Sequence, residues 1–192
     1  LPGQFSTLLN SGETPDQQTG EDLWRANVLG TRALALNMAK AGVRRLILAS
    51  TANFYSPGLT EANELSPISP TSRTLYLGSK AVQEWTAASI CEQHDISFAA
   101  LRLASVVGTG RSVIDHFARR LTAGEPVTIA RQGRFGADFV DVEDIVTGLL
   151  IAADQSLEGV WNVSSGQRRL LVDIAADLAL FSGQEISKSV IV

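Results

Sequence analysis

Short apolar runs alternate with longer helix-like segments along most of the chain. Five short runs are predicted to be strands, namely residues 45–49, 98–107, 127–129, 160–163 and 186–192. Five longer segments are predicted to be helices, namely residues 21–41, 74–93, 112–123, 141–153 and 170–181. Strands that alternate with helices are typical of an α/β protein with a mainly parallel sheet.

Glycine and proline mark the ends of these segments. Gly42 follows the first helix and is expected to be its C-terminal cap. Pro57, Pro67 and Pro70 interrupt residues 50–72, which are predicted to be a long loop of functional character. Residues 1–20 are predicted to be an irregular N-terminal segment.

The composition argues against several classes of protein. The chain has 192 residues, of which 45% are hydrophobic and 19% charged, an ordinary globular balance. A net charge of −4 without a basic cluster argues against nucleic-acid binding and against a polybasic membrane anchor. One cysteine and two histidines argue against a disulfide framework and a zinc site. Because the sequence has neither a membrane-length apolar run nor a secretory signal, we expect a cytoplasmic protein.

Tyr76 and Lys80 are the strongest candidates for chemistry. On a helix, residues with this spacing lie on one face, about one turn apart. Lowering a tyrosine pKa from about 10 to near 7 takes roughly 4 kcal/mol, and one positive charge at about 4 Å supplies that much at an effective dielectric constant near 20. The pair can therefore act as a general acid/base. The alternative is a harmless pair on an exposed helix face.

Two further positions have polar side chains where chemistry would need them. Ser50 and Thr51 follow the strand at residues 45–49, and ligands of open α/β sheets bind outside the carboxyl ends of strands. A hydroxyl there can donate to a substrate oxygen, or it can merely begin a turn. Asn27 and Gly30 both lower helix propensity inside a predicted helix, which suggests a local purpose. The alternative is a surface asparagine beside a close-packing glycine.

A series of motifs carries a family resemblance. In chain order they are Asn27-Val28-Leu29-Gly30-Thr31, residues 42–47, residues 50–55, Tyr76 with Lys80, Leu101-Arg102, residues 138–144 and Trp161-Asn162-Val163. In this order they resemble the extended short-chain dehydrogenase/reductase family of NAD(P)-dependent sugar-nucleotide epimerases, dehydratases and related reductases.

The resemblance implies a role for each motif residue. Tyr76 would be the acid/base, Lys80 would orient the nicotinamide ribose, and Thr51 would hold the reacting carbonyl or alcohol. Asn27 would support the lysine through a proton-relay water. The implied reaction is hydride transfer at a sugar-like or other small alcohol or carbonyl substrate. Implied cofactor contacts are Tyr76, Lys80, Ser50, Arg102 and Ser105, and implied substrate contacts are Thr51, Ala52, Asn53, Ser105 and Arg134.

The implied fold is a partial Rossmann-like, doubly wound parallel sheet with a small α/β substrate-binding region. Residues 21–110 would form the second half of the NAD(P)-binding domain, and residues 111–192 a C-terminally truncated substrate-binding region. The Gly-rich turn that approaches the pyrophosphate of NAD or NADP is missing from these residues. We therefore expect a fragment or an incomplete gene product that binds NAD(P) weakly by itself.

Several positions depart from the family pattern. Ser105 stands where many sugar-nucleotide enzymes have asparagine, and Val107 where tyrosine is frequent. Ala137 stands where an arginine can clamp a diphosphate, with Arg134 as a stand-in. A smaller or less charged substrate is therefore equally expected. The alternative to an enzyme is a non-catalytic relative that acts as a binding or regulatory module.

The resemblance also bears on partners. Relatives often pair two copies of the helix that carries the tyrosine, and Ala81, Ala87 and Ala88 would allow close approach in such a homodimer. The three tryptophans are expected in the core or at an interface. Cys91 is expected to be a packing residue rather than a nucleophile.

Overall fold

The computed structural model describes residues 20–56, 59, 61–69, 75–129, 133 and 135–191. The predicted irregular segment, apart from Gly20, and Arg134 lie outside these described residues. The described residues form two compact units. The first is drawn from residues 20–103 and 145–163, and the second from residues 104–144 and 164–191.

The first unit is built on a three-stranded parallel sheet. Its strands are β1 (Arg45–Thr51), β2 (Ser97–Leu103) and β6 (Gly159–Val163), and β2 lies in the middle. Thr51 at the end of β1 lies opposite Leu103 at the end of β2, so the carboxyl ends of the two strands coincide. The sheet therefore has one shared carboxyl edge, which is where ligands of such sheets bind.

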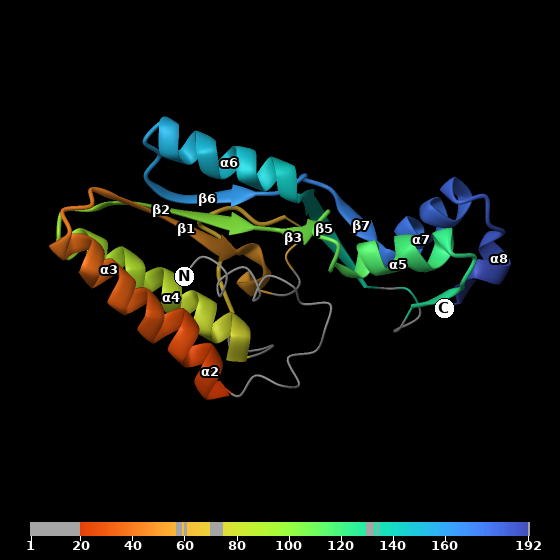
Figure 1. Cartoon of the computed structure of the whole chain (residues 1–192), viewed down its shortest axis with the longest axis horizontal. Coiled ribbons are helices and arrows are strands. Elements are labelled where there is room, and N and C mark those ends of the chain that lie inside the picture. The colour runs from red at the N-terminus through yellow and green to blue at the C-terminus, as the bar shows by residue number, and fades with distance from the viewer. Residues whose placement is uncertain are drawn as a thin grey trace. The chain divides into compact units, whose positions relative to one another are not determined.

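Helices cover both faces of this sheet. α3 (Gly30–Lys40) and α4 (Leu75–Gln93) lie on one face, and α6 (Val142–Asp154) lies on the other (Figure 1). A parallel sheet with both faces covered confirms the predicted Rossmann-like, doubly wound α/β fold.

The first predicted helix is continuous but changes its winding. α2 (Gly20–Trp24) passes into a π-helical turn, η2 (Arg25–Leu29), before α3 begins. Asn27 and Val28 are the buried residues of this turn. The helix ends at Lys40, and Gly42, which is predicted to terminate it, follows with φ +70°, in the left-handed region that favours glycine.

The core of the first unit lies between α4 and the sheet. Leu46 on β1 packs with Ala87 and Cys91 on α4. Cys91 is 1% exposed, which confirms that it is a packing residue. Ala81 and Ala87 are equally buried inside this unit, whereas Ala88 is half-buried, so a homodimer contact through these alanines stays a prediction.

The second unit contains two small sheets. β3 (Ser105–Val107) pairs in parallel with β5 (Gly136–Asp141), which pairs antiparallel with β7 (Arg168–Leu170). β4 (Val127–Thr128) pairs in parallel with β8 (Val190–Ile191). α5 (Val113–Thr122) and α7 (Leu171–Phe181) pack around the core residues Phe117, Leu121 and Ala175.

Two predicted strands are wrong in extent. Residues 98–107 are not one strand, because the chain leaves the first sheet after Leu103, and β3 instead pairs with β5. Residues 186–192 are predicted to be extended, but α8 (Ile186–Ser189) occupies most of them. Both segments are rich in apolar residues, so hydrophobicity alone does not reveal the breaks.

The observed units also differ from the predicted division at residue 110. β6 pairs in parallel with β2, so residues 145–163 belong with the first unit. A pairing between segments about 60 residues apart leaves no local mark in a sequence pattern.

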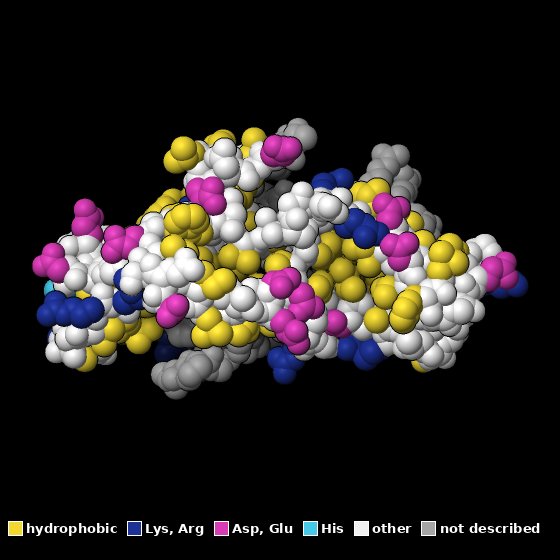
Figure 2. Space-filling model, turned by 90° about the horizontal axis from the view of Figure 1, so that it is seen from above, with side chains coloured by type: hydrophobic (Ala, Val, Ile, Leu, Met, Phe, Trp, Pro, Cys, Tyr) yellow, Lys and Arg dark blue, Asp and Glu magenta, His cyan; other side chains and the backbone are white. Residues whose placement is uncertain are grey.

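The outer side of α6 is partly apolar. Val146, Leu150 and Ile151 are exposed on this helix. Figure 2 shows apolar side chains among charged ones of both signs on the face seen from above. Within the described part of the chain, no helix is long and apolar enough to cross a membrane.

Candidate active site

Lys80 lies buried on α4 with its ammonium group beside the carboxyl end of β1. Its Nζ donates a hydrogen bond to the backbone oxygen of Ala49, at 2.9 Å, and another to Oε1 of Gln83, at 2.5 Å. Burial lowers the pKa of Lys80 to about 8, and the nearby Glu84 carboxylate partly opposes that decrease. The amine therefore stays mostly protonated at neutral pH, and its acceptor Ala49 lies two residues before Thr51.

Tyr76 lies one turn before Lys80 on the same helix. Its ring packs against the cluster of Phe54, Leu77 and Ala81. Burial raises the pKa of Tyr76 above its ordinary value of 10.0, which is opposite to the decrease expected from a nearby lysine. The cause is burial, which removes water from the phenol and disfavours its charged form. Among the described residues, no hydrogen bond joins the phenol to Lys80 or Thr51.

The two hydroxyl residues at the end of β1 have different partners. Thr51 is buried, and its Oγ1 accepts a hydrogen bond from the backbone N–H of Asn53 at 3.1 Å. This bond caps a short 3-10 turn, η3 (Ala52–Phe54), as the turn alternative predicts. Ser50 is fully buried and donates to Oε2 of Glu84 at 2.6 Å. In this structure, therefore, the Ser50 hydroxyl makes a hydrogen bond inside the protein.

Asn27 contacts the segment of α4 between Tyr76 and Lys80. Its Nδ2 donates to Oγ of Ser79 at 2.9 Å, and that hydroxyl donates to the backbone oxygen of Tyr76 at 2.8 Å. Asn27 has no exposed surface, and its Oδ1 accepts no hydrogen bond from the described residues. The alternative of a surface asparagine is therefore wrong. Buried polar atoms usually have a hydrogen-bond partner, so this oxygen marks a place where a donor outside the described residues would fit.

A buried ion pair lies beneath this site, and sequence reasoning missed one half of it. Arg102 on β2 donates from Nη2 to Oε1 of Glu84 at 2.6 Å and from Nε to Oε2 at 3.2 Å. Its Nη1 donates to the hydroxyl of Tyr55, and its guanidinium lies 4.9 Å from the ring centre of Phe54.

The spacing along α4 could have revealed Glu84. Tyr76, Lys80 and Glu84 follow one another at four-residue intervals, which places them on one helix face. That face is buried at Lys80 and Glu84, and a buried carboxylate requires a partner of opposite charge. The identity of the partner depends on the neighbouring strand and is not visible in the sequence.

Tyr55 and Asn162 link the loop after η3 to β6. The hydroxyl of Tyr55 donates to Oδ1 of Asn162 at 2.8 Å, and the backbone N–H of Asn162 donates to Oε1 of Glu64 at 2.8 Å. These contacts join three chain segments on the carboxyl side of the sheet. Tyr55 and Asn162 belong to motifs noted above, but no local sequence signal shows that they contact each other.

Two of the remaining predicted site residues follow Thr51 directly along the chain. The others lie in the second unit or outside the described residues. Ala52 is half-buried and Asn53 exposed in η3. Ser105 lies in β3 of the second unit, half-buried, opposite Phe139. Arg134 lies outside the described residues. The contacts predicted for these residues with cofactor or substrate stay predictions.

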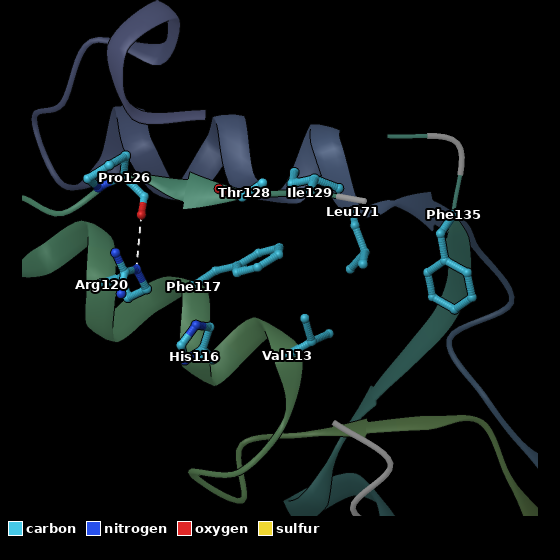
Figure 3. A pocket seen from close by; sticks show the side chains of 9 residues that line it. All are labelled: Val113, His116, Phe117, Arg120, Pro126, Thr128, Ile129, Phe135 and Leu171. Atoms are coloured by element: carbon cyan, nitrogen blue, oxygen red, sulfur yellow. Dashed lines mark hydrogen bonds between the residues drawn. The ribbon is translucent and has the colours of Figure 1, made fainter. Parts of the chain in front are cut away.

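The second unit contains a pocket of its own. It has a volume of about 730 Å³ and a largely apolar lining, made by Val113, His116, Phe117, Arg120, Pro126, Thr128, Ile129, Phe135 and Leu171. Figure 3 shows side chains from α5, β4 and the start of α7 around this space. Nε of Arg120 donates to the backbone oxygen of Pro126 at 2.9 Å. A volume of this order suits part of a small-molecule ligand.

Known proteins resemble this chain in both sequence and fold. The chain is 30% identical over 169 residues to sterol demethylase protein B of Methylococcus capsulatus, covering 77% of this chain and 45% of that protein. It is 30% identical over 134 residues to a probable UDP-glucuronate 4-epimerase of Rhizobium meliloti, covering 65% and 38%. The chain thus spans less than half the length of these two curated relatives.

A solved structure agrees with these sequence matches. The UDP-glucose 4-epimerase of Thermus thermophilus, in complex with NAD, superposes with a TM-score of 0.75 and 26% identity. The superposition covers 85% of this chain and 56% of that one. Residues 9–164 match the model of the NAD dependent epimerase/dehydratase family. With most of its length inside that match, the chain belongs to the NAD-dependent epimerase/dehydratase family.

Proposed function

We propose that this chain carries the acid/base residues of an NAD(P)-dependent epimerase, dehydratase or reductase. The observation that carries the proposal is the buried Lys80, whose Nζ is hydrogen-bonded to the backbone oxygen of Ala49 near the carboxyl end of β1. Buried amines are rare because they are costly, so a site that keeps one at the ligand-binding edge of a sheet suggests a function. The proposed substrate is a sugar-like or other small alcohol or carbonyl compound.

The donor set at this edge fits a nicotinamide cofactor. A lysine ammonium has three N–H donors, and Ala49 and Gln83 accept two of them. The third donor suits a ribose hydroxyl, so Lys80 and Tyr76 are the residues that would hold this part of NAD or NADP. When bound, the cofactor would accept or supply a hydride at the nicotinamide ring.

Tyr76 and Thr51 would act on the substrate oxygen. Both side chains can donate a hydrogen bond at neutral pH, because burial keeps the phenol of Tyr76 protonated. To accept a proton, the phenol must approach Lys80, since a charge at about 4 Å is worth roughly 4 kcal/mol at an effective dielectric constant of 20. We therefore infer that the Tyr76 ring turns toward Lys80 in the reacting complex.

Asn27 and the ion pair would support this pair of residues. The unpartnered Oδ1 of Asn27 supports a bound water that relays protons from the Lys80 side of the helix. Ser50 and Arg102 bind Glu84, so we assign them to holding α4 against the sheet rather than to contact with cofactor. The pocket of the second unit would accept part of the substrate, with Ser105 and Arg134 as further proposed contacts.

A non-catalytic binding or regulatory module is the second candidate. The raised pKa of Tyr76 favours it, because a phenol without nearby positive charge is a poor base at neutral pH. The two candidates differ in whether Tyr76 exchanges a proton with the substrate. A single substitution of Tyr76 therefore distinguishes them.

The test is turnover by Tyr76→Phe in the full-length form of the protein. We expect the rate of hydride transfer to fall by roughly 10²- to 10⁴-fold, which is the usual contribution of a general acid/base. Binding of reduced nicotinamide, measured by its fluorescence, should remain. The matched control is Tyr55→Phe, which removes the chain's other phenol and should lower stability without this loss of rate. A Tyr76→Phe protein with nearly full turnover would favour the binding module.

A further inference from the structure

Gln83 has a buried side-chain amide. It lies on α4 and is 1% exposed. Burying an amide is unfavourable unless both of its ends are hydrogen-bonded. In Gln83 both ends are satisfied, one by Lys80 and one by Thr31. The two hydrogen bonds therefore compensate for the burial of this amide.

The chemistry of its two partners fixes the orientation of the Gln83 amide. Lys80 offers only donors, so the amide oxygen must face it, and that contact is 2.5 Å long. The amide nitrogen then faces Thr31 on α3, and it donates to Oγ1 at 2.9 Å. Thr31 is itself 3% exposed, so the far end of this link lies in the packed interface of α3 and α4.

Two fixed acceptors determine where the Lys80 ammonium points. One is the backbone oxygen of Ala49 on β1, and the other is Oε1 of Gln83 on α4. With two N–H groups directed to these positions, the direction of the third follows from the tetrahedral geometry of the ammonium. A lysine side chain has otherwise many rotamers, so without these two acceptors the ammonium would sample several directions.

We propose that Gln83 is a positioning residue. Its amide is hydrogen-bonded to Thr31 of α3 and orients the Lys80 ammonium toward the carboxyl end of β1. This inference rests on the proposed function, because the aim matters only if Lys80 serves the cofactor and Tyr76. It adds a residue that neither the family motifs noted above nor the spacing of Tyr76 and Lys80 singles out.

The charges around Lys80 agree with this role. The ionisable neighbours of Lys80 on α4 are Tyr76, one turn before it, and Glu84, which raises its pKa and is paired with Arg102 on β2. The ionisable groups on α2, η2 and α3 are exposed, and Arg45 on β1 donates to the backbone of Leu157. Gln83 is therefore the neutral acceptor that stabilises the ammonium from within α4.

The test is a titration of Lys80 by NMR in protein with isotope-labelled lysine side chains. The chain has only three lysines, and Lys40 and Lys188 are exposed, so the Lys80 signal is identified by its loss in Lys80→Arg. Gln83→Met keeps the size of the side chain and removes its oxygen. We expect the titration midpoint of Lys80, about 8 in the unchanged chain, to fall by roughly one pH unit.

Two further variants keep the test decisive. Cys91→Ala creates a small cavity in the same helix, and should leave the midpoint of Lys80 where it was. Gln83→Glu keeps an acceptor oxygen and adds a charge, and should raise the midpoint. An unchanged midpoint in folded Gln83→Met overturns the inference. If that variant does not fold, an unchanged or lower midpoint in Gln83→Glu overturns it.

The titration is independent of turnover, so it separates this inference from the proposed function. A shifted midpoint together with a fully active Tyr76→Phe protein would keep the Gln83–Lys80 link and reject the catalytic role. A fixed midpoint together with an inactive Tyr76→Phe protein would keep the catalytic role and reject the positioning by Gln83.

Discussion

Tyr76 and Lys80 occupy one face of α4, and burial favours the neutral form of each. The pKa of the lysine is lowered to about 8 and that of the tyrosine is raised. A pair that stabilised the phenolate would instead lower the tyrosine pKa. In this structure the ammonium of Lys80 donates to Ala49 and Gln83, and burial is the cause of the raised pKa of Tyr76.

The raised pKa of Tyr76 predicts a loss of stability in alkaline solution. The unfolded chain releases the phenolic proton near pH 10, whereas the folded chain retains it. The stabilisation is therefore complete below pH 10 and falls above it by up to about 1.4 kcal/mol per pH unit. Urea midpoints measured from pH 9 to 12 should fall less steeply for Tyr76→Phe than for the unchanged chain. Parallel curves would contradict the burial of the phenol.

Individual residues determine where the helices end and how they are wound. Gly42 ends α3 in the left-handed region, and Asn27 lies in a π-helical turn instead of an ordinary one. π turns are rare in helices, and those that do occur are often found at functional sites. At η2 the turn directs an asparagine side chain at Ser79 of α4, so a local irregularity of one helix creates a buried contact with the next.

Two glycines of the first unit should respond in opposite ways to alanine. At Gly42 a Cβ would meet no atom within 4 Å, but φ is +70°, so Gly42→Ala should cost about 1 kcal/mol of backbone strain. Gly78 lies inside α4 and has the same free space with a helical φ. Gly78→Ala should therefore stabilise by roughly 0.5–1 kcal/mol. Thermal denaturation of both variants is the measurement, and shifts of the same sign would contradict this account.

The outer sides of α2, η2, α3 and α4 suggest how whole molecules would associate. These helices expose large apolar side chains, namely Trp24, Leu29, Leu34, Leu75 and Trp85. α3 and α4 pack against each other, so their outer sides belong to one helical layer. We propose this layer as the homodimer interface predicted for the Tyr76 helix, with tryptophans in the place of the buried alanines.

Trp85→Asp should prevent this association. Trp85 is 53% exposed on α4, and a charge in the centre of an apolar interface is strongly unfavourable. Sedimentation velocity should show a dimer for the unchanged chain and a monomer for this variant. Trp161→Asp on β6, where the tryptophan is 45% exposed, is the control and should remain dimeric. A monomeric unchanged chain would contradict the proposed interface.

The parts of this protein that were predictable from its sequence are those set by neighbours along the chain. The strand that ends close to Ser50, the helix that carries Tyr76 and Lys80, and the cap at Gly42 all follow from hydrophobic periodicity and backbone preferences. The alternation of these elements also indicated the parallel sheet and, with the motifs, the family.

Contacts between distant segments were decided by tertiary packing alone. Glu84 meets Arg102 across 18 residues, Gln83 meets Thr31 across 52, and Tyr55 meets Asn162 across 107. Packing also buries the phenol of Tyr76 and raises its pKa, whereas the spacing of Tyr76 and Lys80 predicts a decrease. A pKa depends on the surroundings of a group in space, and the position of two residues on one helix face does not determine which acceptor an ammonium chooses.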